Sequence, residues 1–131
     1  VKILGIDAAT SFRSTNGNPS AYTYEGIGVD FFSPVLNTDV IDEFLTVTDE
    51  NGMGILPALA ANYGFLVGPA SGAVVYAALE YARKKFKDGD IGVMIFGDSG
   101  RAYLSKGYYA QNTTPSMTNV VYTKAPCPVT L

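Results

Sequence analysis

Residues 65–96 read FLVGPASGAVVYAALEYARKKFKDGDIGVMIF and carry the pattern that decides the fold. A short apolar run at 65–67 leads into a glycine-containing turn, and apolar residues from Ala73 to Tyr81 then follow at helical spacing. Basic residues end this helix, a turn follows at 88–90, and residues 91–96 form a second apolar strand. This spacing predicts a βαβ unit and hence an α/β fold, a three-layer sandwich with a mainly parallel sheet.

The sequence on the N-terminal side extends this pattern. Residues 1–7 are a nearly continuous apolar run, typical of a strand that is buried on both faces of a parallel sheet. Residues 40–47 predict a strand or a short helix, and residues 48–50 the start of a helix. An apolar stripe from Ile55 to Tyr63 predicts another helix, capped by Gly64, with Pro57 in its first turn or at a kink.

The composition excludes several classes of function. The chain has 131 residues, 47% hydrophobic and 16% charged, which is typical of one globular domain. A net charge of -3 and a sequence pI of about 4.7 argue against nucleic acid as a partner, and no apolar run is long enough for a membrane span. With no histidine and one cysteine, Cys127, we expect no His-based triad, no metal site and no internal disulfide, and we favour a cytoplasmic protein.

Two glycine-containing stretches are candidate binding sites, and each also has a simpler interpretation. In Gly26, Ile27 and Gly28, the glycines let the backbone approach a planar ligand, or they merely form the turn. Ala70 and Ser71 stand at a helix start, where free N–H groups bind an anion or the polar edge of a cofactor. Ser71 is equally well explained as the N-cap of that helix.

A third candidate lies where the apolar run 91–96 ends. Gly97 and Asp98 would follow the carboxyl end of a strand, which is where ligands bind in open α/β sheets, although a plain tight turn is the simpler interpretation. Asp98 and Glu25 are candidates for acid–base chemistry, with surface or capping carboxylates as the alternative. The lysines at 84, 85 and 87 form a solvated cluster, a poor setting for a Schiff-base lysine.

Three segments, taken in order, resemble the pyridoxal-phosphate (PLP) enzymes of the cysteine synthase and cystathionine β-synthase family. They are residues 25–31 (EGIGVDF), residues 64–73 (GFLVGPASGA) and residues 98–106 (DSGRAYLSK). The resemblance runs from Val1 to about Tyr108. Within it, Arg101 and Lys106 are slightly more similar to the cystathionine β-synthases than to the cysteine synthases. It implies a fold-type-II PLP enzyme, with PLP as an electron sink for β-replacement on serine or an O-activated serine by sulfide or homocysteine.

The resemblance also implies which residues line the cofactor and substrate cleft. They are Gly26, Ile27, Gly28, Ala70, Ser71, Gly97 and Asp98. Two positions depart from the family pattern. Ala70 stands where the family usually has a serine that hydrogen-bonds the pyridine nitrogen, so either Ser71 substitutes through a local shift or that hydrogen bond is absent. Gly97 replaces a common proline.

The family's Schiff-base lysine, its asparagine loop for the substrate carboxylate and its phosphate-binding loop all lie upstream of the segment that matches Val1. We therefore expect residues 1–110 to be the C-terminal portion of a catalytic domain, with residues 111–131 as a tail that includes one possible edge strand at 120–123. The chain alone is expected to be inactive. Its expected partners are the N-terminal part of the domain, or a second copy through the exposed edge, in a homodimeric parent that takes a small amino-acid substrate.

Two other interpretations stay open. One is a stand-alone, non-catalytic α/β module that binds a small anion or a partner chain. The other is a split enzyme whose N-terminal half is a separate polypeptide. The first strand distinguishes a fragment from a stand-alone module, because a fragment should expose an unpaired apolar edge whereas a module should have that edge covered.

Overall fold

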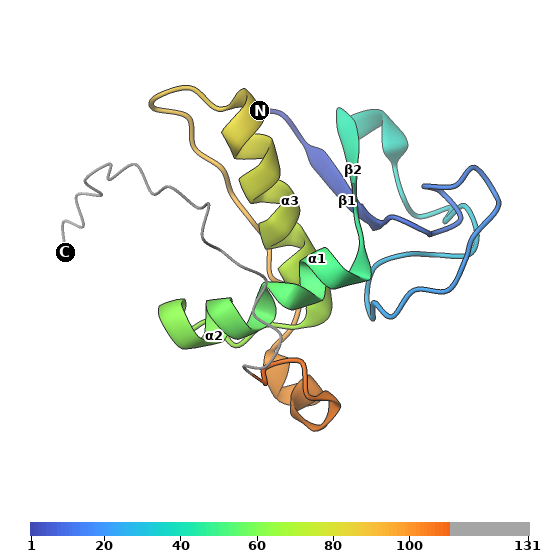
Figure 1. Ribbon diagram of the computed structural model, residues 1–131. Helices are drawn as coiled ribbons and strands as arrows, with labels where there is room; N and C mark the ends of the chain where they lie inside the picture. The colour runs from blue at the N-terminus through green and yellow to red at the C-terminus, as the bar shows by residue number, and fades with distance from the viewer. Residues whose placement is uncertain (111–131) are drawn as a thin grey trace.

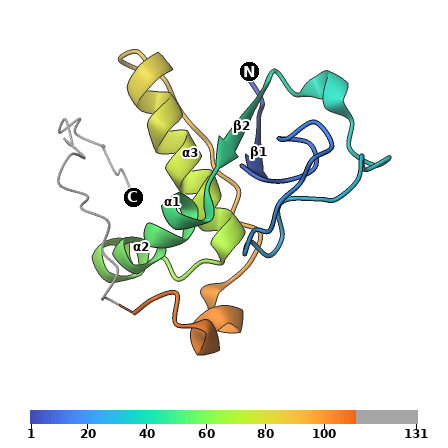
Figure 2. The same ribbon diagram turned by 45° about the vertical axis from the view of Figure 1, so that its right-hand side comes forward.

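The computed structural model describes residues 1–110, which form a small parallel sheet, three α-helices and two 3-10 turns (Figure 1). Strand β1 (Leu4–Ala8) pairs in parallel with β2 (Glu43–Val47), with Leu4 opposite Glu43 and Ala8 opposite Val47. A 3-10 turn, η1 (Thr38–Val40), precedes β2. Helix α3 (Pro69–Lys85) lies along the sheet and runs opposite to both strands in both views (Figures 1 and 2). The α/β class with parallel strands is thereby confirmed.

Two short helices follow β2 and have the ends that the sequence predicts. Helix α1 (Asp49–Gly54) begins after Thr48, whose side chain accepts a hydrogen bond from the Asn51 N–H at 3.4 Å. Helix α2 (Leu56–Tyr63) carries Pro57 in its first turn, where the missing N–H costs nothing. Gly64 ends α2 with φ +71°, a left-handed conformation that favours glycine.

Helix α3 begins three residues earlier than the Ser71 N-cap interpretation requires. Gly68 is the N-cap and Pro69 is the first helical residue, so Ser71 lies inside the first turn and its interpretation as an N-cap was wrong. Proline is favoured at this position because its fixed φ already suits a helix. At the other end, the basic residues expected in the last turn are Arg83, Lys84 and Lys85.

The core has two parts, and α3 contributes to both. In one part, Ala73 and Ala77 of α3 pack against Ala8 and Val47, which end the two strands. In the other part, Val75 packs with residues of α2 and its flanks, among them Leu56, which is fully buried. The small side chains on α3 allow it to approach the sheet closely, so its N-terminal turn is held in a fixed place relative to the strand ends.

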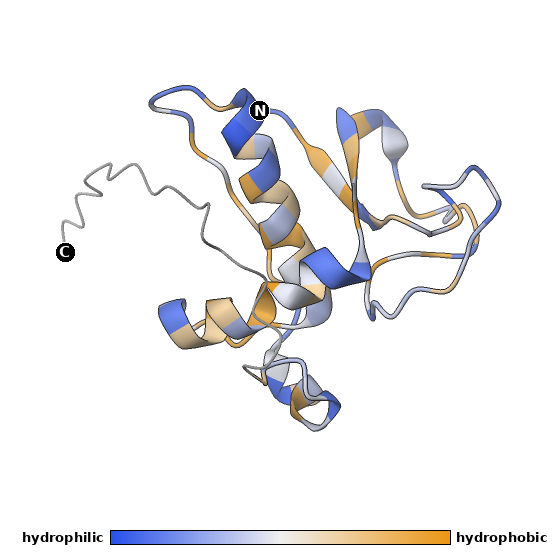
Figure 3. Ribbon diagram, in the orientation of Figure 1, coloured by the Kyte–Doolittle hydropathy of each residue, from blue (hydrophilic) through white to orange (hydrophobic). Residues whose placement is uncertain are grey.

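One strand prediction is only partly met, and a second is not met in the described residues. Residues 4–6 of β1 are half buried rather than fully buried. Strand β2 covers one edge of β1, and no described strand pairs with the other edge. Residues 91–97 form no strand, because none of residues 1–110 pairs with them. Instead they run back along α3 (Figures 1 and 3). Ile91, Val93 and Ile95 are more than 80% exposed.

The short apolar run at 65–67 contributes a single bridge rather than a strand. Val67 pairs with Ser99 in an isolated antiparallel bridge. The edge strand expected at 120–123, like the whole tail 111–131, lies outside the described residues. No helix within residues 1–110 is long and apolar enough to cross a membrane.

Candidate functional site

The segments before and after α3 are joined at the N-terminal end of this helix. The Gly68 N–H donates to the carbonyl oxygen of Asp98 at 3.4 Å, and the Gly100 N–H donates to that of Leu66 at 2.9 Å. Asp98 lies so close to Gly68 that a Cβ at position 68 would overlap the Asp98 carboxylate. The second and third of the three sequence segments therefore meet here, although about 30 residues separate them.

The glycine loop at 25–28 reaches the same helix end. Gly26 has φ +98°, which a residue with a side chain rarely adopts, and its Cα faces Ala70, with 3.5 Å between an ideal Cβ and the Ala70 Cβ. Gly28 lies under the ring of Tyr22, where an ideal Cβ would come within 2.6 Å of ring carbons. The loop conformation thus depends on both glycines, and the first sequence segment joins the other two.

Side-chain contacts from the 3-10 helix η2 (Gly100–Lys106) complete this cluster. Tyr103 donates a hydrogen bond to the Asp98 carboxylate, and the Lys106 ammonium group forms an ion pair with Glu25. The hydrogen bond to Asp98 raises the pKa of Tyr103 to about 12, and the hydrogen bond to Glu25 raises the pKa of Lys106. Asp98 and Glu25, the two carboxylates predicted as candidates for acid–base chemistry, therefore each contact a side chain of η2.

The loop is also attached to α1. The buried Tyr24 hydroxyl donates to the Thr48 carbonyl oxygen at 2.7 Å, and the Thr23 N–H donates to the Asp49 carboxylate. Burial, with a smaller contribution from Asp49, raises the pKa of Tyr24. These contacts fix the chain directly before the first loop glycine, so the loop starts from a rigid position.

Ser71 and Ala70 face different surroundings. Ser71 is 1% exposed, and its hydroxyl oxygen has no hydrogen-bond partner among the described residues. Ala70 is half buried and lies against Gly26. The surface that the loop and the helix share therefore presents the methyl group of Ala70, whereas the only hydroxyl of this turn points into the interior.

Several of the predicted site residues come together and others do not. Gly26, Ala70 and Asp98 surround the start of α3, and Gly97 borders open space, with no described atom within 4 Å of an ideal Cβ. The side chain of Ile27 packs against the core instead. Whether any of these residues binds a cofactor stays a prediction.

Two residues that organise this cluster, Tyr103 and Lys106, were not predicted as site residues. Both lie in the quoted segment 98–106, at a spacing of three, which places them on neighbouring turns of a 3-10 helix. The signal that would have found them is the pair of acidic partners, Asp98 and Glu25, in segments that the resemblance already brings together.

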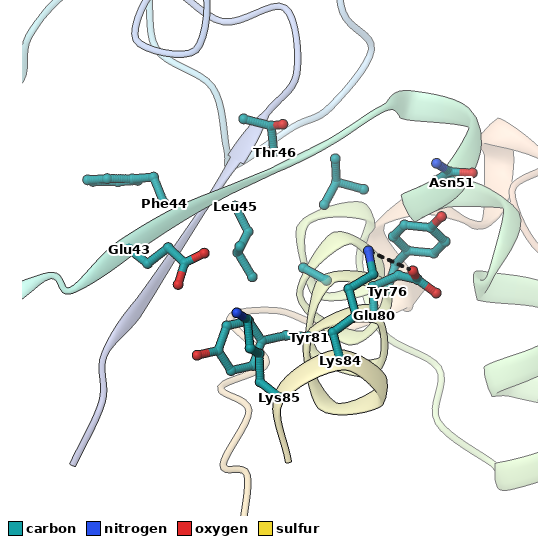
Figure 4. Close-up of a pocket in the computed structure, with 12 residues that line it drawn as sticks. Glu43, Phe44, Leu45, Thr46, Asn51, Tyr76, Glu80, Tyr81, Lys84 and Lys85 are labelled. Atoms are coloured by element: carbon teal, nitrogen blue, oxygen red, sulfur yellow. Dashed lines mark ion pairs between the residues drawn. The ribbon is translucent and has the colours of Figure 1, made fainter.

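A separate pocket of about 490 Å³ lies between β2 and α3 (Figure 4). Leu45 and Tyr76 contribute to its walls, and Glu80 and Lys84 form an ion pair at its rim. None of the predicted site residues lines this pocket.

Comparisons with known proteins agree with the sequence resemblance. The chain is 42% identical over 109 residues to the O-acetylserine dependent cystathionine beta-synthase of Bacillus subtilis, and the match covers 83% of this chain and 35% of the relative. The cysteine synthase of Helicobacter pylori is 38% identical, with the same coverage of both chains. A crystal structure of the O-acetylserine dependent cystathionine beta-synthase from Helicobacter pylori superposes with a TM-score of 0.74 at 38% identity, covering 83% of this chain and 35% of that one. No family model matches the chain.

The chain is a homologue of the cysteine synthases and cystathionine β-synthases. Its architecture is that of a fold-type-II PLP enzyme domain. The chain spans about a third of the length of the curated relatives, since the matches cover 35% of each. The resemblance and the fold class are thereby confirmed. The comparisons also fit the expectation that this chain is one part of such an enzyme.

Proposed function

We propose that this chain is the C-terminal portion of the catalytic domain of a PLP-dependent enzyme that replaces the β-substituent of serine or an O-activated serine with sulfide or homocysteine. The observation that carries the proposal is the meeting of three segments, distant in sequence, at the N-terminal end of α3. Gly26 faces Ala70, and Asp98 lies against Gly68. Homology to cysteine synthases and cystathionine β-synthases supports the same assignment.

The described residues fit one wall of a PLP site. Gly97 borders open space, and Gly26 and Ala70 present only backbone and a methyl group, so a flat ring can approach them closely. PLP, when bound, would supply an electron sink that permits loss of the β-substituent. The chain's own residues would hold and orient the ring: Gly26 and Ala70 against one part, Gly97 and Asp98 against its edge.

Among the described residues at the start of α3, neither Ala70 nor Ser71 offers a side-chain donor to the pyridine nitrogen on this wall. Ala70 carries no hydrogen-bonding side chain, and the Ser71 hydroxyl is buried away from the surface. We therefore infer that the side-chain hydrogen bond which the family pattern implies is absent here, unless the first turn of α3 shifts. The ring would then be held mainly by shape and by backbone contacts on this side.

The partner we propose is the remainder of the catalytic domain. Two surfaces are ones that a further strand would pair with and bury: the edge of β1 with which no described strand pairs, and the exposed apolar residues at 91, 93 and 95. The Schiff-base lysine and the phosphate loop would come from that remainder, so the 131-residue chain alone would be inactive. We further propose that the parent is a cytoplasmic homodimer with a small amino-acid substrate.

Intact-mass analysis of the native polypeptide, captured with an antibody to residues 1–110, tests this proposal. We expect a chain near three times this length, and borohydride reduction should fix PLP irreversibly to a lysine outside residues 1–131. A native chain near 13.9 kDa that captures neither PLP nor a second, lysine-bearing polypeptide would refute the proposal. That result would instead support the stand-alone module. A separate polypeptide that carries the labelled lysine would indicate a split enzyme.

A further inference from the structure

The ion pair between Lys106 and Glu25 joins two positions that are 81 residues apart in sequence. Glu25 directly precedes Gly26, the residue that faces Ala70, and Lys106 is the last residue of η2. The pair therefore connects the glycine loop to the segment that follows Asp98. This contact lies at the proposed cleft.

The ion pair closes a ring of contacts around the start of α3. Gly68 contacts Asp98 through the backbone, and Asp98 accepts a hydrogen bond from Tyr103. Both Tyr103 and Lys106 belong to η2, and Lys106 pairs with Glu25. Gly26 then returns to α3 at Ala70. Each contact fixes the next, so removal of the one between η2 and the loop would open the ring.

The ion pair between Lys106 and Glu25 is exposed to solvent, so we expect it to affect the glycine loop more than the stability of the whole domain. The side chains of Lys106 and Glu25 are 42% and 46% exposed, and ion pairs this exposed contribute little to global stability. The other side of the loop is already held by the Tyr24 hydroxyl at the Thr48 carbonyl oxygen. The ion pair would therefore control the position of Gly26 to Gly28 rather than the folding of the domain.

We propose that Lys106 is a positioning residue, whose ion pair with Glu25 holds the glycine loop against the N-terminal turn of α3 and so sets the width of the ligand cleft. The inference about the cleft rests on the proposed function, but the contact between loop and η2 does not. Lys106 acts through Glu25 and the loop, and it needs no contact with substrate or cofactor.

Hydrogen–deuterium exchange on the full native polypeptide, without added ligand, tests the proposal. In Lys106→Met and in Glu25→Gln, we expect the Phe12 amide, which donates to the carbonyl oxygen of Val29 next to the glycine loop at 3.2 Å, to exchange about two- to fivefold faster, the range that an exposed ion pair supports. Lys106→Arg should keep the wild-type rate. The double variant Glu25→Lys with Lys106→Glu should restore most of the protection, which a merely structural loss would not. Lys87→Met, at an exposed lysine beyond α3, is the matched control and should change nothing.

Two results would overturn the proposal. One is unchanged exchange of the Phe12 amide in Lys106→Met; the other is faster exchange that the charge-swapped pair fails to reverse. Failure of the proposed function is distinguishable, because it would appear as the absence of a borohydride-labelled lysine while the exchange pattern stays as expected. In a polypeptide that does bind PLP, Lys106→Met should raise the KM for the amino-acid substrate more than it lowers kcat, since loop position affects binding first.

Discussion

Gly72 of α3 faces the carbonyl oxygen of Gly52 in α1, and no side chain separates the two backbones at this crossing. Tyr24 fills the remaining space, because its hydroxyl lies where a Cβ of Gly52 would be. The same tyrosine precedes the glycine loop and is anchored at Thr48. The close approach of α1 and α3 therefore determines where the loop meets the N-terminal turn of α3, and packing in the interior sets the geometry of the proposed site.

Gly72→Ala should destabilise the protein, although glycine to alanine usually stabilises a helix. A Cβ at position 72 would overlap the Gly52 carbonyl oxygen and would come within 2.9 Å of Leu56. We expect the free energy of unfolding to fall by about 1–3 kcal/mol, the usual cost of overpacking. Urea denaturation measures this change. Gly97→Ala is the control, since nothing lies within 4 Å of its ideal Cβ, and an equal loss in both variants would contradict the argument.

Gly26→Ala should strain the glycine loop. The φ of +98° at Gly26 is unfavourable for any residue with a side chain, which costs about 1–3 kcal/mol where the surroundings keep the conformation. We expect a loss of stability in that range, or a loop that relaxes, which should speed exchange of the Phe12 amide bonded to the Val29 carbonyl oxygen. Urea denaturation together with hydrogen–deuterium exchange separates these two results. Wild-type stability with wild-type exchange would show that the loop does not need glycine here.

The hydrogen bond from Tyr103 to Asp98 predicts a measurable titration. Because the pKa of Tyr103 is raised to about 12, its contribution to stability is complete below the ordinary pKa of about 10 and is lost as pH rises from there through 12. In Asp98→Asn, the Tyr103 pKa should fall back towards 10. Ultraviolet difference titration between pH 9 and 11.5, with Tyr103→Phe subtracted from each background, isolates this hydroxyl. Identical titration of Tyr103 in both backgrounds would argue against the hydrogen bond.

The sequence predicted those elements whose ends depend on residues near them in the chain, and it failed for an element that depends on a distant partner. The ends of α2 were predictable because Pro57 and Gly64 act on their own backbone, and the turn before residue 91 likewise depends on its glycine. The strand at 91–96 was predicted from apolar residues alone. A strand also needs a neighbour to pair with, and residues 1–110 supply none.

The candidate site was predictable as a set of backbone positions and not as a set of side-chain contacts. Gly26, Ala70 and Asp98 were found because glycine loops, helix starts and strand ends have recognisable local patterns. The orientation of Ser71 was not, because a serine near a helix start is a good N-cap, and only the placement of Pro69 at the first helical position moves it inside. The ion pair of Lys106 with Glu25 depends on tertiary structure, so no local sequence pattern predicts it.

Exchanging the hydroxyl between positions 70 and 71 tests which of them can serve a ligand. Ser71→Ala removes a buried hydroxyl without a partner among the described residues, so we expect the free energy of unfolding to rise by about 1 kcal/mol and the PLP affinity of the native polypeptide to stay unchanged. Ala70→Ser places a hydroxyl on the surface shared with Gly26, where we expect about fivefold tighter binding of PLP, the value of one ordinary hydrogen bond. Absorbance titration with PLP measures both Kd values. If Ser71→Ala weakened PLP binding instead, Ser71 would be the donor, and the first turn of α3 would have to rotate when the ligand binds.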